Sequence, residues 1–288
     1  TMILYLYRIV LWFFAPMVLL RLLFKASQEP AYGKRVAERF GHSPEHLETG
    51  GIWFHTVSAG ETIAAAPVVA KILAEDLGLP VMVTTMTPSG SEMVKKIFED
   101  RVGHCYLPYD YKFSVSRFFD RTDPKMLVLM ETELWPNLIN EAWARLIPVV
   151  CINARLSEKS AKGYRLVGPL TKRLLSQIDF IACQSDVHAR RFQELGSERA
   201  KVEAYGNIKF DLVTPADLLT RSSHEREKFQ LSGRHVWIAA STHEGEELIV
   251  MNVFTRLRET HPNLCLIVVP RHPSRAPKIV TQFQSEGF

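Results

Sequence analysis

Short, continuous apolar runs alternate with amphipathic stretches through the first two thirds of the chain. The apolar runs lack the alternation of a strand with one solvated face, so each predicts a strand buried on both faces. Predicted strands cover residues 52–57, 80–85, 126–130, 148–152 and 180–183, and another precedes residue 206. Predicted helices lie between them, over residues 61–74, 89–98, 136–144, 159–175 and 186–195. This alternation predicts a parallel α/β sheet.

Residues 201–234 lose this rhythm and predict an interdomain linker that carries one helix. The βα pattern then restarts, with predicted strands over 235–240 and 264–269, a helix over 246–258 and a helix from about residue 276. Two strands are fewer than a stable sheet needs, so this second domain is expected to be incomplete. The predicted division is an anchor (residues 1–27), a first α/β domain (28–211) and the start of a second (212–288).

The N-terminus, residues 2–24, is almost wholly apolar, with two arginines and one proline as interruptions. Its longest uncharged run, Ile9 to Leu20, has 12 residues, fewer than the roughly 20 that span a bilayer. No cleavage site closes the run, so we expect a retained membrane anchor with Arg8 reaching the headgroups. The basic residues from Arg21 onward would keep the chain on the cytoplasmic side. A buried core helix is the alternative.

Composition narrows the function classes. The chain is 47% hydrophobic and 23% charged, as in a packed globular protein. A net charge of +4 falls short of a nucleic-acid-binding signature, but it suits work beside anionic lipid or on phosphates. The four cysteines form no CxxC pair, which favours buried thiols over structural zinc. P-loop, GxSxG and HExxH motifs are also absent from the sequence.

Candidate chemistry stands where predicted strands end, because open parallel sheets bind ligands at the carboxyl ends of their strands. Ser58-Ala59-Gly60-Glu61 follows the first strand, and Glu131 and Glu133 follow the strand over 126–130. In the second domain, "STHEGEE" (241–247) and "PRHPSR" (270–275) follow the two strands. Carboxylates thus gather in the first domain and cations or hydroxyls in the second. This division predicts a cleft with acid–base chemistry on one side and anion binding on the other.

Each of these stretches also has a purely structural interpretation. Ser58 and Glu61 match a capping box, in which the glutamate carboxylate accepts the Ser58 backbone N–H, and this is as consistent with the sequence as catalysis. The acids of "ETELWPN" suit the start of a helix at Pro136. The helix after "STHEGEE" could bind phosphate through its free N–H groups. Arg271 and Arg275 could be solvated charges, although an arginine at a strand end suits phosphate.

Taken together, seven stretches resemble the Kdo (3-deoxy-D-manno-octulosonic acid) transferases of Gram-negative bacteria. In order they are "WFHTVSAGE" (53–61), "TTMTPSG" (84–90), "YLPYD" (106–110), "ETELWPN" (131–137), "NARLS" (153–157), "GNIKFD" (206–211) and "PRHPSR" (270–275). The resemblance implies a GT-B fold, with two Rossmann-like domains facing a cleft. It also implies inverting transfer of Kdo from CMP-Kdo to the lipid A precursor (lipid IVA), at the cytoplasmic face of the inner membrane.

The resemblance further implies roles for individual residues. Glu61 would be the general base, and Glu131 a second catalytic residue on the acceptor side. Donor contacts would come from Ser241, Thr242, Arg271, His272, Asn207 and Lys209. Acceptor contacts would come from Ser58, Gly60, Glu133, Arg155 and Lys162. Neither a metal nor another cofactor is expected, because an arginine and a helix N-terminus could stabilise the single phosphate of CMP. The expected partners are the two substrates and inner-membrane lipid, with no nucleic acid, and no oligomeric state is predicted.

Two rival functions stay open. A nucleotide-sugar epimerase would have a similar two-domain architecture, but such enzymes are soluble, and the apolar N-terminus counts against one. A membrane-tethered scaffold would use the same α/β domains to bind a partner, with Glu61 acting only as a helix cap.

Overall fold

The computed structural model describes residues 2–45, 47–211 and 217–288. The chain divides into two compact units, Thr1–Val213 and Thr214–Phe288. The described residues do not include 212–216, which contain the start of the predicted second domain and part of the predicted linker. The parallel α/β class predicted from the apolar runs is confirmed in both units.

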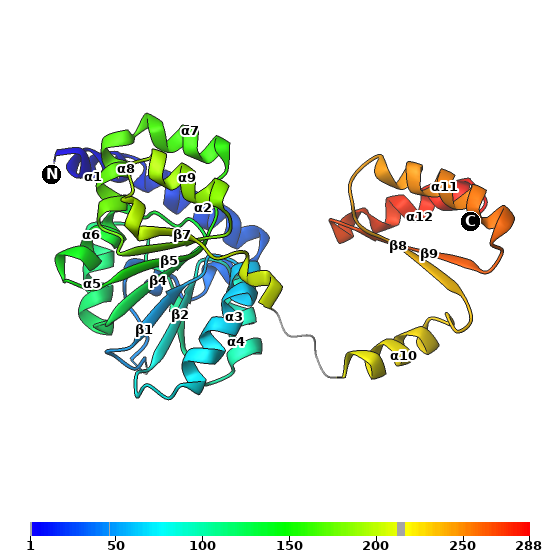
Figure 1. The fold of residues 1–288 in the computed structure, drawn as a ribbon, viewed down its shortest axis with the longest axis horizontal. Coiled ribbons are helices and arrows are strands. Elements are labelled where there is room, and N and C mark those ends of the chain that lie inside the picture. Colours follow the sequence, from blue (N-terminus) through cyan, green and yellow to red (C-terminus); the bar gives the residue numbers. More distant parts are fainter. Residues whose placement is uncertain (1, 46, 212–216) are drawn as a thin grey trace. The chain divides into compact units, whose positions relative to one another are not determined.

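The first unit is built on a seven-stranded parallel sheet with the order β3-β2-β1-β4-β5-β6-β7 (Figure 1). Its strands are β1 (Ile52–His55), β2 (Val81–Thr85), β3 (Gly103–Tyr106), β4 (Met126–Met130), β5 (Val149–Ala154), β6 (Phe180–Cys183) and β7 (Val202–Ala204). The order reverses between β1 and β4, which pair in register from Ile52↔Met126 to His55↔Leu129. This is the topological switch point at which doubly wound sheets bind ligands.

Seven helices pack on this sheet: α3 (Ala59–Ala74), α4 (Pro88–Phe98), α5 (Lys112–Thr122), α6 (Pro136–Ala144), α7 (Glu158–Leu166), α8 (Gly168–Ser176) and α9 (Asp186–Glu194). Side chains alternate between the two faces, as strand geometry requires. Phe54 joins a core under α3 and α4, whereas Trp53 joins the core under α5, α6, α8 and α9. Trp53 packs on Phe118 and Phe119 at centroid distances of 4.7 and 5.3 Å. Both faces are thus covered, which explains the unbroken apolar strands.

Three details differ from the sequence prediction. The edge strand β3 and helix α5 were not predicted. The prediction of a single helix over residues 159–175 is wrong, because this segment forms two helices that meet at Val167. Gly168 and Pro169 explain the break, because proline lacks the N–H that a continuous helix would need. Residues 28–51, between the N-terminal helices and the first strand, carry two 3₁₀ turns, η1 (Pro30–Gly33) and η2 (Val36–Phe40). Two more 3₁₀ turns lie near the end of the first unit, η3 (Arg199–Lys201) and η4 (Ile208–Asp211).

The apolar N-terminus forms two helices, α1 (Met2–Phe13) and α2 (Ala15–Gln28). In the part of the chain that the structure describes, no single helix is long and apolar enough to cross a bilayer, but this pair together has the length and composition, with a bend of 49°. Tyr7 donates a hydrogen bond to Asp110 (2.8 Å), and Arg8 donates one to Asn137 (2.7 Å). Arg8 therefore binds the first unit through Asn137, and its expected contact with lipid headgroups stays a prediction.

One side of this helix pair contacts the first unit and the other is exposed. Leu4 and Leu22 are buried. The exposed large apolar residues of the pair are Met2, Tyr5, Leu6, Ile9, Val10, Trp12, Phe13, Phe14, Met17, Leu19, Leu20, Leu23 and Phe24. Single exposed apolar residues are ordinary, but a contiguous surface of this kind marks an interaction site. The pair is thus not a buried core helix, and its role as a membrane anchor stays a prediction.

The second unit has a two-stranded parallel sheet of β8 (His235–Thr242) and β9 (Leu264–Pro270), the two strands predicted from the sequence. Its helices are α10 (Leu218–Lys228), α11 (Glu246–Thr260) and α12 (Ala276–Ser285), with a 3₁₀ turn, η5 (Pro273–Arg275), before the last. Met251, Phe254 and Ile279 are buried and come from α11 and α12. The sheet places the ends of β8 and β9 side by side, at Thr242 and Pro270.

Candidate active site

The turn from β1 into α3 holds the Glu61 carboxylate with two donors. Ser58 is the N-cap of α3, and its Oγ accepts the Glu61 backbone N–H (3.5 Å). Glu61 Oε2 accepts the Val57 N–H at 2.8 Å, and Oε1 accepts the Ser58 hydroxyl at 3.2 Å. A reciprocal cap therefore exists, but the N–H that reaches the carboxylate belongs to Val57, so the expectation that it belongs to Ser58 is wrong. Glu61 is only half-buried, which leaves part of its carboxylate accessible.

The neighbouring strand β4 ends at Met130, and the next residue, Glu131, has a φ of 57°, in the left-handed region. A non-glycine residue there is strained by roughly 1–2 kcal/mol, so the surroundings must hold it. Its N–H donates to Ile152 O, and its carboxylate pairs with Arg155 at 3.5 Å. Two residues on, Glu133 Oε2 accepts the indole N–H of Trp135 at 2.8 Å. The backbone turn thus fixes two carboxylates directly beyond β4.

The three glutamates interact electrostatically. Burial raises the pKa of Glu61, the Val57 N–H opposes this, and the Glu131 charge raises the pKa further. Burial raises the pKa of Glu133 to about 7, with a second contribution from the Glu61 charge. We name Glu61, Glu131 and Glu133 the acid cluster. A carboxylate with a raised pKa is a better proton acceptor than a solvated one while it still ionises near neutral pH.

The segment after β7 reaches the same edge of the sheet. The Lys209 charge lowers the pKa of Glu61, so the two side chains lie within electrostatic range. Asn207 Oδ1 accepts the Lys209 backbone N–H (3.0 Å), and Asn153 Oδ1 accepts the Ile208 N–H (3.2 Å). Asn207 therefore shapes the turn that presents Lys209 toward the acid cluster. The predicted donor contacts of Asn207 and Lys209 stay predictions.

The acceptor residues predicted beyond the acid cluster lie on the surface. Gly60 is exposed, and a Cβ built on it would meet nothing closer than Ser58 Oγ at 3.9 Å, so the space before it is open. Arg155 is exposed and pairs with Glu131. Lys162 forms an exposed pair with Glu158 on α7 (2.9 Å), an arrangement that contributes little to stability. Arg155 is thus held at the acid cluster, whereas Lys162 pairs within its own helix.

The predicted donor residues of the second unit stand together at the ends of β8 and β9. Ser241 is exposed with a φ of 58°, and the Arg271 N–H donates to Thr242 O (3.0 Å). The Thr242 hydroxyl is buried and donates to Glu247 (2.7 Å), so it faces the interior of the unit. Arg271 and His272 are exposed. Hydroxyl and cationic groups therefore do meet here, except for the Thr242 side chain.

Two residues of these edges have roles that the sequence did not reveal. Arg275 forms a two-pronged pair with Glu247, with both N–O distances at 2.9 Å, and also donates to Thr242 O. It thereby neutralises Glu247 and fixes the end of β8, a role that its position in "PRHPSR" did not reveal. Trp135, which holds Glu133, was also missed, although an indole two residues after a glutamate was a usable signal.

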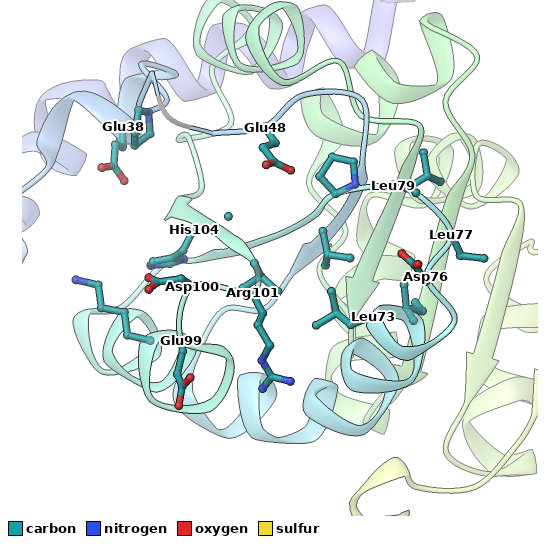
Figure 2. A pocket seen from close by; sticks show the side chains of 18 of the residues that line it. Glu38, Glu48, Leu73, Asp76, Leu77, Leu79, Glu99, Asp100, Arg101 and His104 are labelled. Carbon is teal, nitrogen blue, oxygen red and sulfur yellow. The ribbon is translucent and has the colours of Figure 1, made fainter.

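A cavity of about 780 Å³ has no residue of the acid cluster in its lining. Figure 2 shows part of that lining. Leu77 and Leu79 line it from the segment before β2, and Arg101 from the segment before β3. It therefore opens at the amino ends of these strands, where doubly wound sheets do not bind their ligands. Its lining mixes both signs of charge, such as Arg101 and Asp100, and favours no ligand class. Among the described residues, no group of three or more His, Cys, Asp or Glu side chains could hold a metal ion.

Comparison with known proteins shows the family of the chain. The family described as 3-deoxy-D-manno-octulosonic-acid transferase (kdotransferase) matches residues 34–212. The 3-deoxy-D-manno-octulosonic acid transferase of Haemophilus influenzae is 40% identical over 275 residues, 95% of this chain and 64% of that protein. A probable mitochondrial 3-deoxy-D-manno-octulosonic acid transferase of Arabidopsis thaliana is 34% identical over 287 residues, 98% of this chain and 64% of that protein.

Among solved structures, UDP-GlcNAc 2-epimerase from Neisseria meningitidis matches with a TM-score of 0.59 at 14% identity, over 82% of this chain and 69% of that one. At this identity the match shows the fold alone. The fold, with candidate residues at the carboxyl ends of its parallel strands, places the protein in the GT-B class of α/β proteins. Within that class, the family match and the identity to curated relatives decide the family. The chain belongs to the Kdo transferase family, and it spans 64% of the length of these two relatives.

Proposed function

We propose that the protein is an inverting glycosyltransferase of lipopolysaccharide biosynthesis that moves Kdo from CMP-Kdo to the lipid A precursor. The observation that carries this proposal is the Glu61 carboxylate, held by Val57 and Ser58 at the switch point between β1 and β4. Membership of the Kdo transferase family supports the sugar that is transferred. The donor, the acceptor and the role of Glu61 are our inference.

Glu61 acts as the general base in this proposal. The acceptor hydroxyl oxygen forms a bond to the anomeric carbon of Kdo, and its proton passes to the Glu61 carboxylate. The bond from that carbon to the phosphate oxygen of CMP breaks, and its electron pair leaves with CMP. Displacement from the opposite side inverts the anomeric centre. The Glu131 charge supports this role because it raises the pKa of Glu61, and so makes the carboxylate more basic.

The second unit supplies donor binding in this proposal. Arg275 neutralises Glu247, so the carboxylate at the start of α11 does not repel a phosphate nearby. In the part of the chain that the structure describes, no side chain accepts a hydrogen bond from the Arg271 guanidinium, which is exposed beyond β9. A planar guanidinium matches phosphate oxygens two at a time. We therefore assign the CMP phosphate to Arg271, with His272 and Ser241 beside it and no metal ion.

The exposed apolar side of α1 and α2 supports work at a membrane surface. Lipid would cover the apolar residues, while Tyr7 and Arg8 keep α1 on the first unit. The net charge of +4 favours an anionic leaflet. We propose that the protein acts at the cytoplasmic face of the inner membrane, where a lipid acceptor could reach the acid cluster without leaving the bilayer.

Product analysis by mass spectrometry tests the proposal. Full-length protein is incubated with CMP-Kdo and lipid IVA, and the mass added to the lipid is recorded for the wild type and for Glu61→Gln. The glutamine oxygen can still accept the Val57 N–H, so stability should change by at most about 1 kcal/mol. Transfer should fall by about 10²–10⁴-fold, as for a lost general base.

Asp186→Asn is the matched control, because it also removes a carboxylate from the first turn of a helix, at the end of β6. It should leave transfer unchanged. If Glu61→Gln keeps its activity and loses only stability, Glu61 is a cap and not the base. If the wild type adds no Kdo but changes the configuration of a nucleotide sugar, the protein is an epimerase. If it does neither, the scaffold interpretation stands.

A further inference from the structure

Arg39 is a buried guanidinium whose hydrogen bonds are incomplete. Only 2% of the residue is exposed. Its Nη1 donates to Met86 O at 3.1 Å, but Nε and Nη2 are buried and have no partner among the described residues. Removing a charge and its donors from water costs several kcal/mol unless both are matched. An incomplete match of this kind indicates that another group completes the site.

The carboxylates near Arg39 are already bound elsewhere. Glu38, the preceding residue, pairs with Arg35 (2.7 Å) and accepts the Tyr106 N–H (2.8 Å). Asp110 accepts the Tyr7 hydroxyl and the N–H groups of α6. The face of the Arg39 guanidinium lies 4.2 Å from the centroid of Tyr106, a cation–π contact that leaves the N–H edge unused. The two unpartnered donors, Nε and Nη2, are buried, so the guanidinium acts on its surroundings mainly through its positive charge.

Arg39 lines a cavity of about 340 Å³ between the N-terminal helices and the ends of β1 and β2. We name it the helix-pair cavity. Leu11, Val18 and Leu22 form its apolar wall on α1 and α2, and Arg21 and Lys25 also line it. Burial raises the pKa of the Tyr109 phenol in this lining, and Arg39 and Arg21 both oppose that shift, so both positive charges reach the phenol. The cavity therefore combines apolar surface with converging cations, and the buried carboxyl group of Asp110 also lines it.

The helix-pair cavity adjoins the acid cluster through two of its lining residues. Val57 lines it, and the Val57 N–H holds the Glu61 carboxylate. Trp135 also lines it, and its indole N–H holds Glu133. The cavity lining and the acid cluster therefore share Val57 and Trp135 as contact residues. The neighbours of the cavity on the other side are the helices with the exposed apolar surface.

We propose that the helix-pair cavity binds a phosphate group of the lipid acceptor, with Arg39 as its buried counter-charge and Arg21 and Lys25 as further cations. This inference rests on the proposed function. The buried positive charge of Arg39 attracts the phosphate, and the acyl chains next to that phosphate lie against Leu11, Val18 and Leu22. The phosphate of CMP fits less well, because it carries no apolar chain. The cavity thus orients the acceptor hydroxyl toward Glu61 by holding the acceptor at a second point.

Steady-state kinetics of Arg39→Met test this inference, since methionine keeps much of the packing over Tyr106 and removes the charge. Two acceptors are compared in the full-length protein, lipid IVA and the same lipid after enzymatic removal of its phosphates. Arg39→Met should raise the KM for lipid IVA by about 10–100-fold, the effect of a lost charged hydrogen bond. The KM for CMP-Kdo and the kinetics with the dephosphorylated lipid should not change. Arg101→Met, an exposed arginine at the larger cavity, should change none of these values.

Three results would overturn the inference: an equal effect of Arg39→Met on both acceptors, a raised KM for CMP-Kdo, or weaker binding to phosphatidylglycerol vesicles with an unchanged acceptor KM. The last would assign the cavity to bulk lipid headgroups. If Arg39→Met does not fold, the double variant Arg21→Met with Lys25→Met carries the same expectation. If the wild type transfers no Kdo, the proposed function fails. Calorimetric binding of the two lipids then still decides whether the cavity selects phosphate.

Discussion

The contact that holds α1 on the first unit allows a quantitative test through Tyr7→Phe. The Tyr7 hydroxyl donates to Asp110 Oδ2 at 2.8 Å, and the same oxygen accepts the Asn137 N–H at 2.9 Å. The other oxygen accepts the Leu138 N–H at 2.8 Å. Phenylalanine keeps the ring and removes one of three donors. A hydrogen bond to an ionised group is worth about 1.5–3 kcal/mol and one to a neutral group about 0.5–1.5 kcal/mol.

The loss should therefore depend on pH. Burial raises the pKa of Asp110 to about 7 from 3.8, and the Tyr7 hydroxyl opposes this because it favours the carboxylate. A carboxyl group whose folded pKa is raised stabilises the fold at low pH and loses that contribution as pH rises through the folded value. Without the hydroxyl, ionised Asp110 is less well satisfied. Tyr7→Phe should thus cost about 1 kcal/mol at low pH and about 2–3 kcal/mol above pH 7.

Urea unfolding in a mild detergent, followed through tryptophan fluorescence, measures both values by linear extrapolation. Tyr5→Phe is the matched control, because Tyr5 lies on the same helix with 64% of its surface exposed. That variant should change stability by less than about 0.5 kcal/mol at either pH. Equal losses for the two variants, or a larger loss for Tyr7→Phe at low pH, would refute the role of this hydrogen bond.

Three further predictions concern the first unit. Glu131→Gln removes a negative charge that raises the pKa of Glu61, so the acid limb of the pH profile of kcat/KM should move to lower pH; an unchanged or raised limb would contradict the coupling. Gly51→Ala should lower the free energy of unfolding by about 2 kcal/mol or more, because its Cβ would lie 1.9 Å from Pro80 O. Thermal unfolding should show a correspondingly lower midpoint temperature. Gly60→Ala meets open space and should gain up to about 1 kcal/mol in helix stability, so a loss of transfer in that variant would mark the approach of the acceptor.

Much of the first unit could be predicted because its signals are local. The strands β4 and β6 and the helix α6 have the bounds expected from their apolar runs. Strand β3 was missed because "GHCY" is short and partly polar, as an edge strand can be. Helix α5 was missed because "KFSVSRFFDRT" is dominated by polar residues, and only the packing of Phe118 and Phe119 on Trp53 shows its apolar side.

The candidate site was predictable only where it, too, depends on local signals in the sequence. Because parallel strands end at the same edge of a sheet, the sequence alone predicts that Glu61 and Glu131 lie on one edge. The helix-pair cavity was not predictable, because it depends on contacts between distant segments. Tyr7 and Asp110 are 103 residues apart, and nothing local in either segment indicates the other. The unmatched donors of Arg39 likewise become visible only when burial and partners are known together.

The separation of Arg8 from Asn137 also sets an order of events during synthesis. These partners lie 129 residues apart. At about 5–20 residues per second, the ribosome needs roughly 6–26 s after Arg8 before it adds Asn137. Throughout that interval Arg8 lacks its Asn137 partner, and the exposed apolar side chains of the helix pair can meet solvent, a chaperone or a bilayer. Docking of α1 is therefore a late step of maturation, and whatever receives the emerging N-terminus does so before the acid cluster exists.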